Sequence, residues 1–232
     1  MAPFDFPLEV IRTNRKRSVA IQILGDTVRV RAPKTLSERR IHSIIAKRTA
    51  WIKRKLREQA ERPALKPKEY VSGEAFQYLG RNYRLKVVKT PKASTKPSIK
   101  MQQGYLVATI PETTANPQRR IKALLRDWYQ VRAEQRLKEK TERLAKVVGV
   151  TPRSITVRDY KSRWGSCSVK GDISYNWQII LAPHRIIDYV VIHELCHILE
   201  HNHSPQYWKQ VEKYVPDWRD CRAWLKDNPI IF

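Results

Sequence analysis

One short stretch, His193-Glu194-Leu195-Cys196-His197, constrains the fold of this chain more than any other, because it spaces two imidazoles four residues apart. On a helix, residues four apart lie one turn above each other on the same face. Apolar residues that include Ile186, Ile187, Val190, Val191, Leu195 and Ile198 give that helix a broad surface for burial in a core. Two imidazoles placed in this way can bind one metal ion, with Glu194 beside them to accept a proton from water. The stretch therefore predicts a buried helix that carries a divalent-metal site.

A third metal ligand must come from residues that follow this helix. On a straight helix His201 would lie about 12 Å along the axis from His193, too far to share an ion. The sequence Asn202-His203-Ser204-Pro205 predicts a turn in which Ser204 caps the next helix and Pro205 is its first residue. We therefore expect His203 to be the third ligand and the chain to bind one Zn²⁺. The residues considered for this third ligand are Glu200, His201, His203 and Glu212.

Positive charge is concentrated in the first two thirds of the chain. The formal net charge is +24; residues 1–150 hold 35 Lys and Arg against 13 Asp and Glu, whereas residues 151–232 hold 11 against 9. A strongly basic surface attracts polyanions such as DNA or RNA. We expect residues 1–111 to be a basic region that docks on nucleic acid, and residues 112–232 to be the catalytic domain.

Membrane proteins and disulfide-rich proteins are excluded by composition. No apolar run reaches the roughly 18 to 20 residues that a bilayer helix needs, and the first residues lack the apolar core of a signal peptide. We expect a cytoplasmic protein with no membrane partner. Cys167, Cys196 and Cys221 are odd in number and form no CxxC pair, so they predict neither a disulfide framework nor a zinc ribbon.

Residue patterns along the chain predict an α+β fold. Residues 8–31 alternate as strands do, with a Gly25-Asp26 turn between two of them, and the spacing from 35 to 61 predicts one basic amphipathic helix. Further short strands follow, up to a domain boundary near Pro111. A long helix is expected from Pro117 to Gly149, because Pro favours helix starts and Gly favours helix ends. The N-terminal region is thus mostly β with one helix.

Three stretches in the last third of the chain resemble a known family. They are SRWGSCS at 162–168, the stretch from ISYNW to DYVVIHELCH at 173–197, and NHSPQYW at 202–208. They are similar to the YgjP-like metal-dependent hydrolases, a zincin family related to the SprT-like and WLM metalloproteases. The resemblance implies a zincin-like catalytic module, zinc held by His193, His197 and His203, and Glu194 as general base. Metzincins share the spacing from His197 to His203, but they have Gly where this chain has Glu200, so their turn is not expected.

A zincin module also implies a position for a peptide substrate. In zincins a strand along the cleft pairs with an extended substrate through backbone hydrogen bonds, and residues 173–179 are our candidate for that strand. The RWGSC loop is either a tight turn with a packed Trp or a substrate contact. The side chains predicted to bind substrate or stabilise an oxyanion are Arg163, Trp164, Tyr175, Asn176 and Tyr207.

Three functions are compatible with these residues. The first is a zinc metallopeptidase that uses water activated by the metal, with Glu194 as base, and that is directed to nucleic-acid-associated protein. The second is a metal-dependent nucleotide phosphohydrolase or pyrophosphatase, although the chain has no G-x-x-x-x-G-K-[ST] phosphate loop. The third is a non-enzymatic nucleic-acid-binding protein with a structural zinc site. Glu194 favours catalysis over the third function, since it lies beside the ligands and is not needed to hold the ion.

Overall fold

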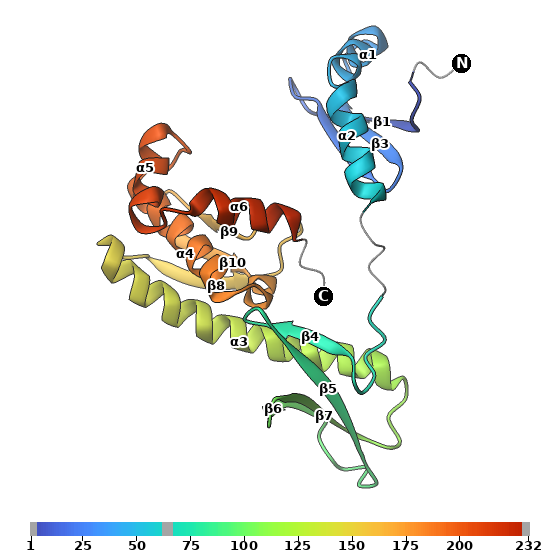
Figure 1. Ribbon diagram of the computed structural model, residues 1–232, viewed down its shortest axis with the longest axis vertical. Coiled ribbons are helices and arrows are strands. Elements are labelled where there is room, and N and C mark those ends of the chain that lie inside the picture. The colour runs from blue at the N-terminus through green and yellow to red at the C-terminus, as the bar shows by residue number, and fades with distance from the viewer. Residues whose placement is uncertain (1–3, 62–66, 229–232) are drawn as a thin grey trace. The chain divides into compact units, whose positions relative to one another are not determined.

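The computed structural model describes residues 4–61 and 67–228, and it has the mixed α and β content that the sequence predicts (Figure 1). The chain divides into two compact units, 1–67 and 68–232. This division precedes the boundary expected near Pro111, because the strands between 75 and 111 share a core with the helix that follows them. Cys167, Cys196 and Cys221 are free thiols.

The first unit is a small sheet covered by two helices. Strands β1 (Leu8–Thr13), β2 (Ala20–Leu24) and β3 (Thr27–Pro33) lie in the order β1-β3-β2. The hairpin predicted at Gly25-Asp26 is present, with Leu24 opposite Thr27, whereas β1 runs parallel to β3. Helices α1 (Glu38–Ala46) and α2 (Thr49–Ala60) follow. The core of this unit consists of Phe6, Val28, Val30, Ala32, Ile41, Ile45 and Ile52.

The single helix predicted between 35 and 61 is instead two helices, with a break at Lys47 and Arg48. A straight helix over residues 38–60 would be about 35 Å long, whereas a seven-residue strand spans about 23 Å. One continuous helix would therefore extend beyond the sheet. The break keeps Ile41 and Ile45 of α1 and Ile52 of α2 in the same core.

Within residues 68–228, the second unit contains two sheets and four α-helices. The four-stranded sheet has the order β4-β5-β7-β6 and the three-stranded sheet the order β8-β10-β9. Both contain one parallel pair, β5 with β7 and β8 with β10. The elements are β4 (Ala75–Tyr78), β5 (Arg81–Thr90), β6 (Ser98–Gln102), β7 (Tyr105–Pro111), α3 (Pro117–Val148), β8 (Ser154–Arg158), β9 (Gly165–Cys167), β10 (Asp172–Asn176), the 3₁₀ helix η1 (Trp177–Leu181), α4 (His184–Leu199), α5 (Pro205–Tyr214) and α6 (Trp218–Asp227).

The long helix α3 connects the two sheets of the second unit, and Figure 1 shows it extending from one sheet to the other. It begins at Pro117 and is followed by Gly149 in the left-handed region, as predicted. Its buried residues recur at helical spacing, and Tyr129 donates a hydrogen bond to the Gln77 carbonyl of β4 at 2.7 Å. Further along, Thr141 lies 3.1 Å from the Tyr175 hydroxyl of β10. Despite its 32 residues, neither α3 nor any other helix in the described residues is apolar enough to cross a membrane.

Candidate metal centre

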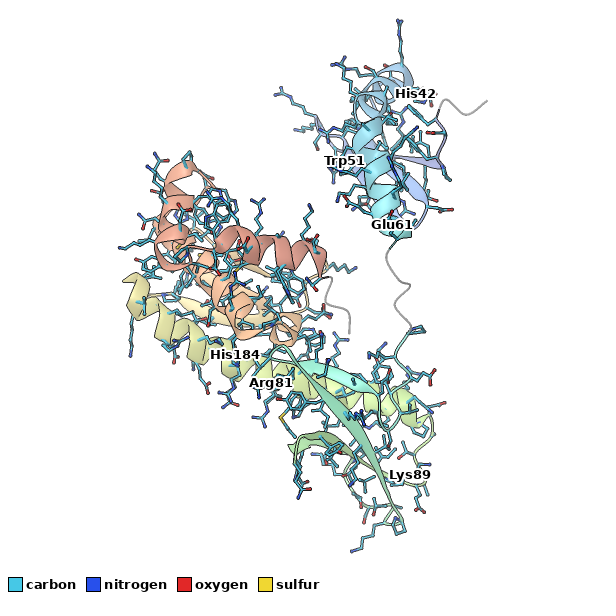
Figure 2. The ribbon with its side chains drawn as sticks, viewed as in Figure 1. His42, Trp51, Glu61, Arg81, Lys89 and His184 are labelled. Carbon is cyan, nitrogen blue, oxygen red and sulfur yellow. The ribbon has the colours of Figure 1, made fainter. Side chains whose placement is uncertain are left out.

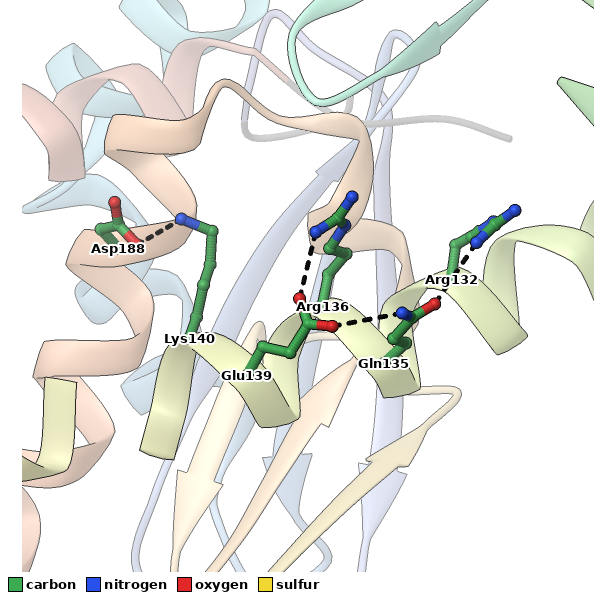
Figure 3. Close-up of polar contacts among 6 residues, drawn as sticks. All are labelled: Arg132, Gln135, Arg136, Glu139, Lys140 and Asp188. Carbon is green, nitrogen blue, oxygen red and sulfur yellow. Dashed lines mark hydrogen bonds and ion pairs between the residues drawn. The ribbon is translucent and has the colours of Figure 1, made fainter. Parts of the chain in front are cut away.

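Helix α4 carries the His193–His197 stretch and is held firmly in the second unit. Eight apolar residues among its sixteen are buried, which matches the broad apolar surface that the sequence predicts. On its polar side Asp188 accepts a hydrogen bond from Lys140 of α3 at 2.6 Å, and Figure 3 shows this pair joining the two helices. The Lys140 side chain is only 12% exposed, so this ion pair is better shielded than a surface pair. The metal helix is therefore fixed against α3.

Three imidazoles converge at one end of α4. The donor atoms of His193, His197 and His203 all lie within 4.8 Å of one another. His203 reaches this point because the chain turns before α5, where the Ser204 hydroxyl accepts a hydrogen bond from the Tyr207 N–H at 3.2 Å and Pro205 is the first helical residue. The bend predicted from the sequence is therefore present.

The distance between two of these rings suits ligands of one ion. The Nε2 atoms of His193 and His203 are 3.2 Å apart. Two nitrogens that bind one tetrahedral zinc at 2.0–2.1 Å are separated by about 3.3 Å. The Nδ1 of His197 lies 3.1 Å from the Glu200 carbonyl oxygen, which leaves Nε2 of that ring free for a metal.

The other candidate ligands lie outside this group. His201 is exposed and does not join the cluster. Glu200 contributes its backbone carbonyl, which orients His197, and not its carboxylate. Glu212 accepts a hydrogen bond from Arg219 at 2.7 Å. Among the residues that the structure describes, the three histidines are the group that could hold a metal.

The protonation state of the three rings suits a divalent cation. Burial, together with the neighbouring His197 and His203, lowers the pKa of His193 to about 3. Burial also lowers the pKa of His197 and His203. Because only neutral imidazoles bind metal, the rings are in the binding form at neutral pH. Three nitrogen donors at this separation fit zinc and also fit related transition-metal ions.

Glu194 lies beside the histidines in a buried position. Its side chain is 4% exposed and packs directly on β9, where a Cβ at Gly165 would lie 2.5 Å from its Oε1. Burial raises the pKa of Glu194 to about 8, and the charge of Arg163 acts in the opposite direction. A carboxyl group with a pKa near neutrality can both accept and return a proton. This is the property that a general base in hydrolysis needs.

The close approach of Gly165 to Glu194 gives a first prediction. Gly165→Ala should force the carboxyl group to move, because the new Cβ would overlap Oε1, Cδ and Cγ. We expect hydrolysis to fall by about 100-fold, the scale expected when a reacting group is misplaced by about 1 Å. Metal content should not change, since the three atoms nearest the new methyl group all belong to Glu194. The measurement is the rate of hydrolysis alongside elemental analysis.

Ser166→Ala is the matched control for this prediction. The Ser166 hydroxyl lies 3.1 Å from the Tyr160 hydroxyl, so its side chain is directed away from Glu194. The control should keep nearly full activity. Equal losses in the two variants would show that β9 as a whole, and not the contact with Glu194, is sensitive to substitution.

An aromatic column packs against the three histidines. The Tyr207 hydroxyl donates to the His193 carbonyl at 2.9 Å, and its ring stacks on His197 at 4.4 Å. Trp208 stacks on His203 with 5.5 Å between ring centres, and Trp218 of α6 stacks on Trp208 at 4.1 Å. Tyr207 is fully buried against the histidines, and its role as a substrate contact stays a prediction. Sequence reasoning missed Trp218, which is brought here only by the packing of α6.

Two further residues predicted to bind substrate are buried in the supporting structure. Tyr175 is fully buried, with its hydroxyl bonded to Thr141. Asn176 is 3% exposed, and its amide donates to the carbonyls of Tyr160 and Arg163 at 3.0 and 3.3 Å. Asn176 therefore holds the loop that precedes β9, and Tyr175 joins β10 to α3. A role of either side chain in substrate binding stays a prediction. Trp164, which is partly buried, and Arg163, which is exposed, remain predictions as substrate contacts.

The strand that could pair with a substrate differs from the one predicted. Residues 172–176 form β10, which pairs with β8 on one side and β9 on the other, so its backbone is already occupied. The two edge strands are β8 and β9, and β9 is the one that packs on Glu194. Backbone hydrogen bonds join Ser168 to Asp172 at 2.9 Å and Asn176 to Trp164 at 2.8 Å. The alternation of an antiparallel ladder then directs the N–H and C=O groups of Gly165 and Cys167 away from β10, toward the free edge.

A family model matches most of this chain. The family model described as "YgjP-like, metallopeptidase domain" matches residues 17–228. The chain belongs to this family. The match includes most of the first unit and nearly all of the second, and it confirms the resemblance carried by the three stretches in the last third. Members of the YgjP-like family are metal-dependent hydrolases, and the chain is assigned to that class with them.

A similar solved structure is the metallopeptidase zymogen abylysin of Pyrococcus abyssi. It is 23% identical, the alignment covers 39% of this chain and 93% of that chain, and the TM-score is 0.36. The search of curated proteins found no match.

Proposed function

We propose that this chain is a zinc-dependent peptidase in which His193, His197 and His203 hold the ion and Glu194 is the general base. The observation that supports this most directly is the placement of a buried carboxyl group beside three neutral imidazoles. A structural zinc site is normally closed by four protein ligands, whereas a catalytic site keeps one position open. The described residues offer three ligands, and the exposed His203 leaves the group accessible to solvent.

The chemistry follows from the positions of these residues. Zinc, when bound, acts as a Lewis acid that lowers the pKa of a water molecule toward 7 and polarises the scissile carbonyl. Glu194 accepts the proton of the attacking water as the new C–O bond forms. When the C–N bond breaks, Glu194 returns that proton to the leaving nitrogen. The surrounding burial keeps this carboxyl group in place for both transfers.

The edge strand β9 is the proposed binding element for an extended peptide. Its outward N–H and C=O groups at Gly165 and Cys167 can extend the three-stranded sheet by one antiparallel or parallel strand of substrate. The same Gly165 packs on Glu194, so a peptide paired with β9 would lie beside the general base. Arg163, just before β9, is the proposed partner for the oxyanion, because its charge already acts on Glu194.

Removal and return of the metal tests this proposal. We expect chelation to abolish hydrolysis of an unfolded protein or a fluorogenic peptide, and one equivalent of Zn²⁺ to restore it. The same preparation is assayed against a panel of nucleoside triphosphates. Hydrolysis of nucleotides without hydrolysis of peptides would replace the peptidase by the phosphohydrolase alternative. Peptide hydrolysis that survives complete removal of metal would reject the metal-dependent mechanism.

We also propose that basic residues within 1–111 dock the enzyme on nucleic acid, so that its substrates are proteins bound there. The charge distribution supports this, since residues 1–150 carry 35 Lys and Arg against 13 Asp and Glu. Salt-dependent binding of an oligonucleotide to the full chain tests the docking separately from hydrolysis.

A further inference from the structure

The four-stranded sheet has one covered face and one open face. Its inner face packs into the core with α3 through Phe76, Tyr78, Leu85, Leu106, Ala108 and Ile110. Because side chains alternate along a strand, the residues between these point to the opposite side. We define the outer sheet face by Arg84, Lys86 and Val88 of β5, Tyr105, Val107 and Thr109 of β7, and Ser98, Lys100 and Gln102 of β6.

Strand register arranges the outer sheet face in rows. Arg84 and Gln102 both lie opposite Tyr105, and Lys86 and Lys100 both lie opposite Val107. In the first row the Tyr105 ring of β7 therefore lies between Arg84 and Gln102. In the next row Val107 lies between the two cations Lys86 and Lys100. Neighbouring strands are about 4.8 Å apart, so each row spans about 10 Å.

Aromatic and apolar surface remains exposed on this face. Tyr105 is 44% exposed and Val88 is 36% exposed. Beside Tyr105 there is a hollow of about 230 Å³ lined by Lys86, Val88, Gln102, Gln103, Tyr105 and Val107. This is smaller than the roughly 300–1,000 Å³ of sites for drug-sized ligands. The hollow therefore suits a single planar group and not a large cofactor.

The charged side chains between residues 75 and 111 are all positive. Residues 75–111 contain seven Lys and Arg and no Asp or Glu. None of these seven cations forms an ion pair with a carboxylate in the part of the chain that the structure describes. Figure 2 shows the side chains around β5, between the labelled Arg81 and Lys89. Unneutralised cations around an exposed ring complement a partner that carries both phosphates and planar bases.

We propose that the outer sheet face binds single-stranded nucleic acid. A base stacks on Tyr105, and Arg84, Lys86 and Lys100 bind the phosphates on either side. A duplex hides its base faces, so it could use the cations but not the exposed ring. This proposal deepens the docking part of the proposed function and places it in the same unit as the metal site, while binding itself requires no hydrolysis.

The first test removes charge from the outer sheet face. Full-length zinc-loaded protein is titrated with a fluorescent 20-nucleotide single strand over a range of salt concentrations. For Lys86→Gln with Lys100→Gln we expect about tenfold weaker binding and a salt slope reduced by about 1.4, since each phosphate contact on a single strand contributes about 0.7. Lys92→Gln with Lys96→Gln removes the same charge from the loop between β5 and β6 and should change binding less than threefold.

The second test concerns the ring. Tyr105→Ala should weaken single-strand binding by about five- to twentyfold, because stacking is lost, whereas Tyr105→Phe should bind as the wild type does. Binding of a duplex of the same length should be weaker than single-strand binding and unaffected by Tyr105→Ala. Ultraviolet cross-linking to the unmodified protein, with mass spectrometry, should place the oligonucleotide on the peptide that contains Tyr105, which gives a readout even if a variant fails to fold.

Several results would overturn the proposal. These are equal losses in the two double variants, a duplex bound as tightly as the single strand, full binding by Tyr105→Ala, or cross-links confined to the first unit. Anionic vesicles that compete with the oligonucleotide and lose binding with the same variants would instead indicate a membrane surface as partner. Failure of the hydrolase proposal would leave these binding results unchanged, and so the two proposals fail separately.

Discussion

Glu194→Gln is expected to lower peptide hydrolysis by about 10²- to 10⁴-fold while the protein keeps its metal. The amide fills the same space on Gly165 but cannot accept a proton from water. Elemental analysis and peptide hydrolysis, measured on one preparation, check the two parts together. Activity close to that of the wild type would show that another group acts as base, and loss of the metal would show that Glu194 is needed to hold it.

The same substitution is expected to stabilise the metal-free protein at high pH. Burial raises the pKa of Glu194 from its ordinary 4.5 to about 8. Between these values the folded chain keeps a proton that the unfolded chain releases, so the free energy of unfolding falls as pH rises through this window. The Gln side chain has no proton that titrates in this range, so its contribution does not change with pH. The increase in the free energy of unfolding caused by Glu194→Gln should therefore be near zero at pH 4.5 and about 2–4 kcal/mol at pH 8.

Urea unfolding of both proteins after chelation, at pH 4.5 and pH 8, measures this difference. The comparison should also be made with zinc restored, where the cation favours the charged carboxylate and the gain should shrink. A gain that is the same at both pH values would show that the effect is one of packing and not of buried charge.

His203→Ala is expected to lower zinc affinity by more than about 100-fold and to abolish hydrolysis. Loss of a ligand should exceed the 10- to 100-fold effect of a residue that only orients one. His201→Ala is the matched control, because it removes an exposed imidazole two residues away that lies outside the cluster. The control should keep one equivalent of zinc and full activity.

Competition with a chromogenic chelator measures the affinities of His203→Ala, His193→Ala and the control. Equal loss of affinity in His203→Ala and His201→Ala would show that the turn is disturbed and would leave His203 unproven as a ligand. Retention of zinc by His203→Ala would require a different third ligand.

The features that the sequence predicted correctly are those encoded by short-range spacing. The interval between His193 and His197 fixes a helix face, and the helix was found. Ser204 and Pro205 fix the start of α5, which places His203 beside the pair. The limits of α3 were similarly apparent, because Pro117 and Gly149 are helix-end residues whose effect is local.

The features that could not be predicted depend on contacts between distant segments. β10 lies in the centre of its sheet because β8 and β9 pair with it from both sides, and an alternating pattern does not show how many neighbours a strand has. Tyr175 and Asn176 were therefore expected to be accessible. Trp218 reaches the aromatic column only through the packing of α6. The break between α1 and α2 reflects the length of the sheet beneath these two helices.

The unpaired edge of β9, as the proposed binding element, has a consequence for the proteins that could be cleaved. Its three residues offer main-chain hydrogen bonds at Gly165 and Cys167, and every peptide has the complementary groups regardless of its side chains. A strand that binds only through main-chain hydrogen bonds selects its substrates by their conformation and not by their side chains. Helices and paired strands already use these groups internally, so only a stretch that leaves its own fold can be bound. Susceptibility among proteins of similar sequence should then follow the free energy of local opening, and damaged or partly unfolded molecules should be degraded first.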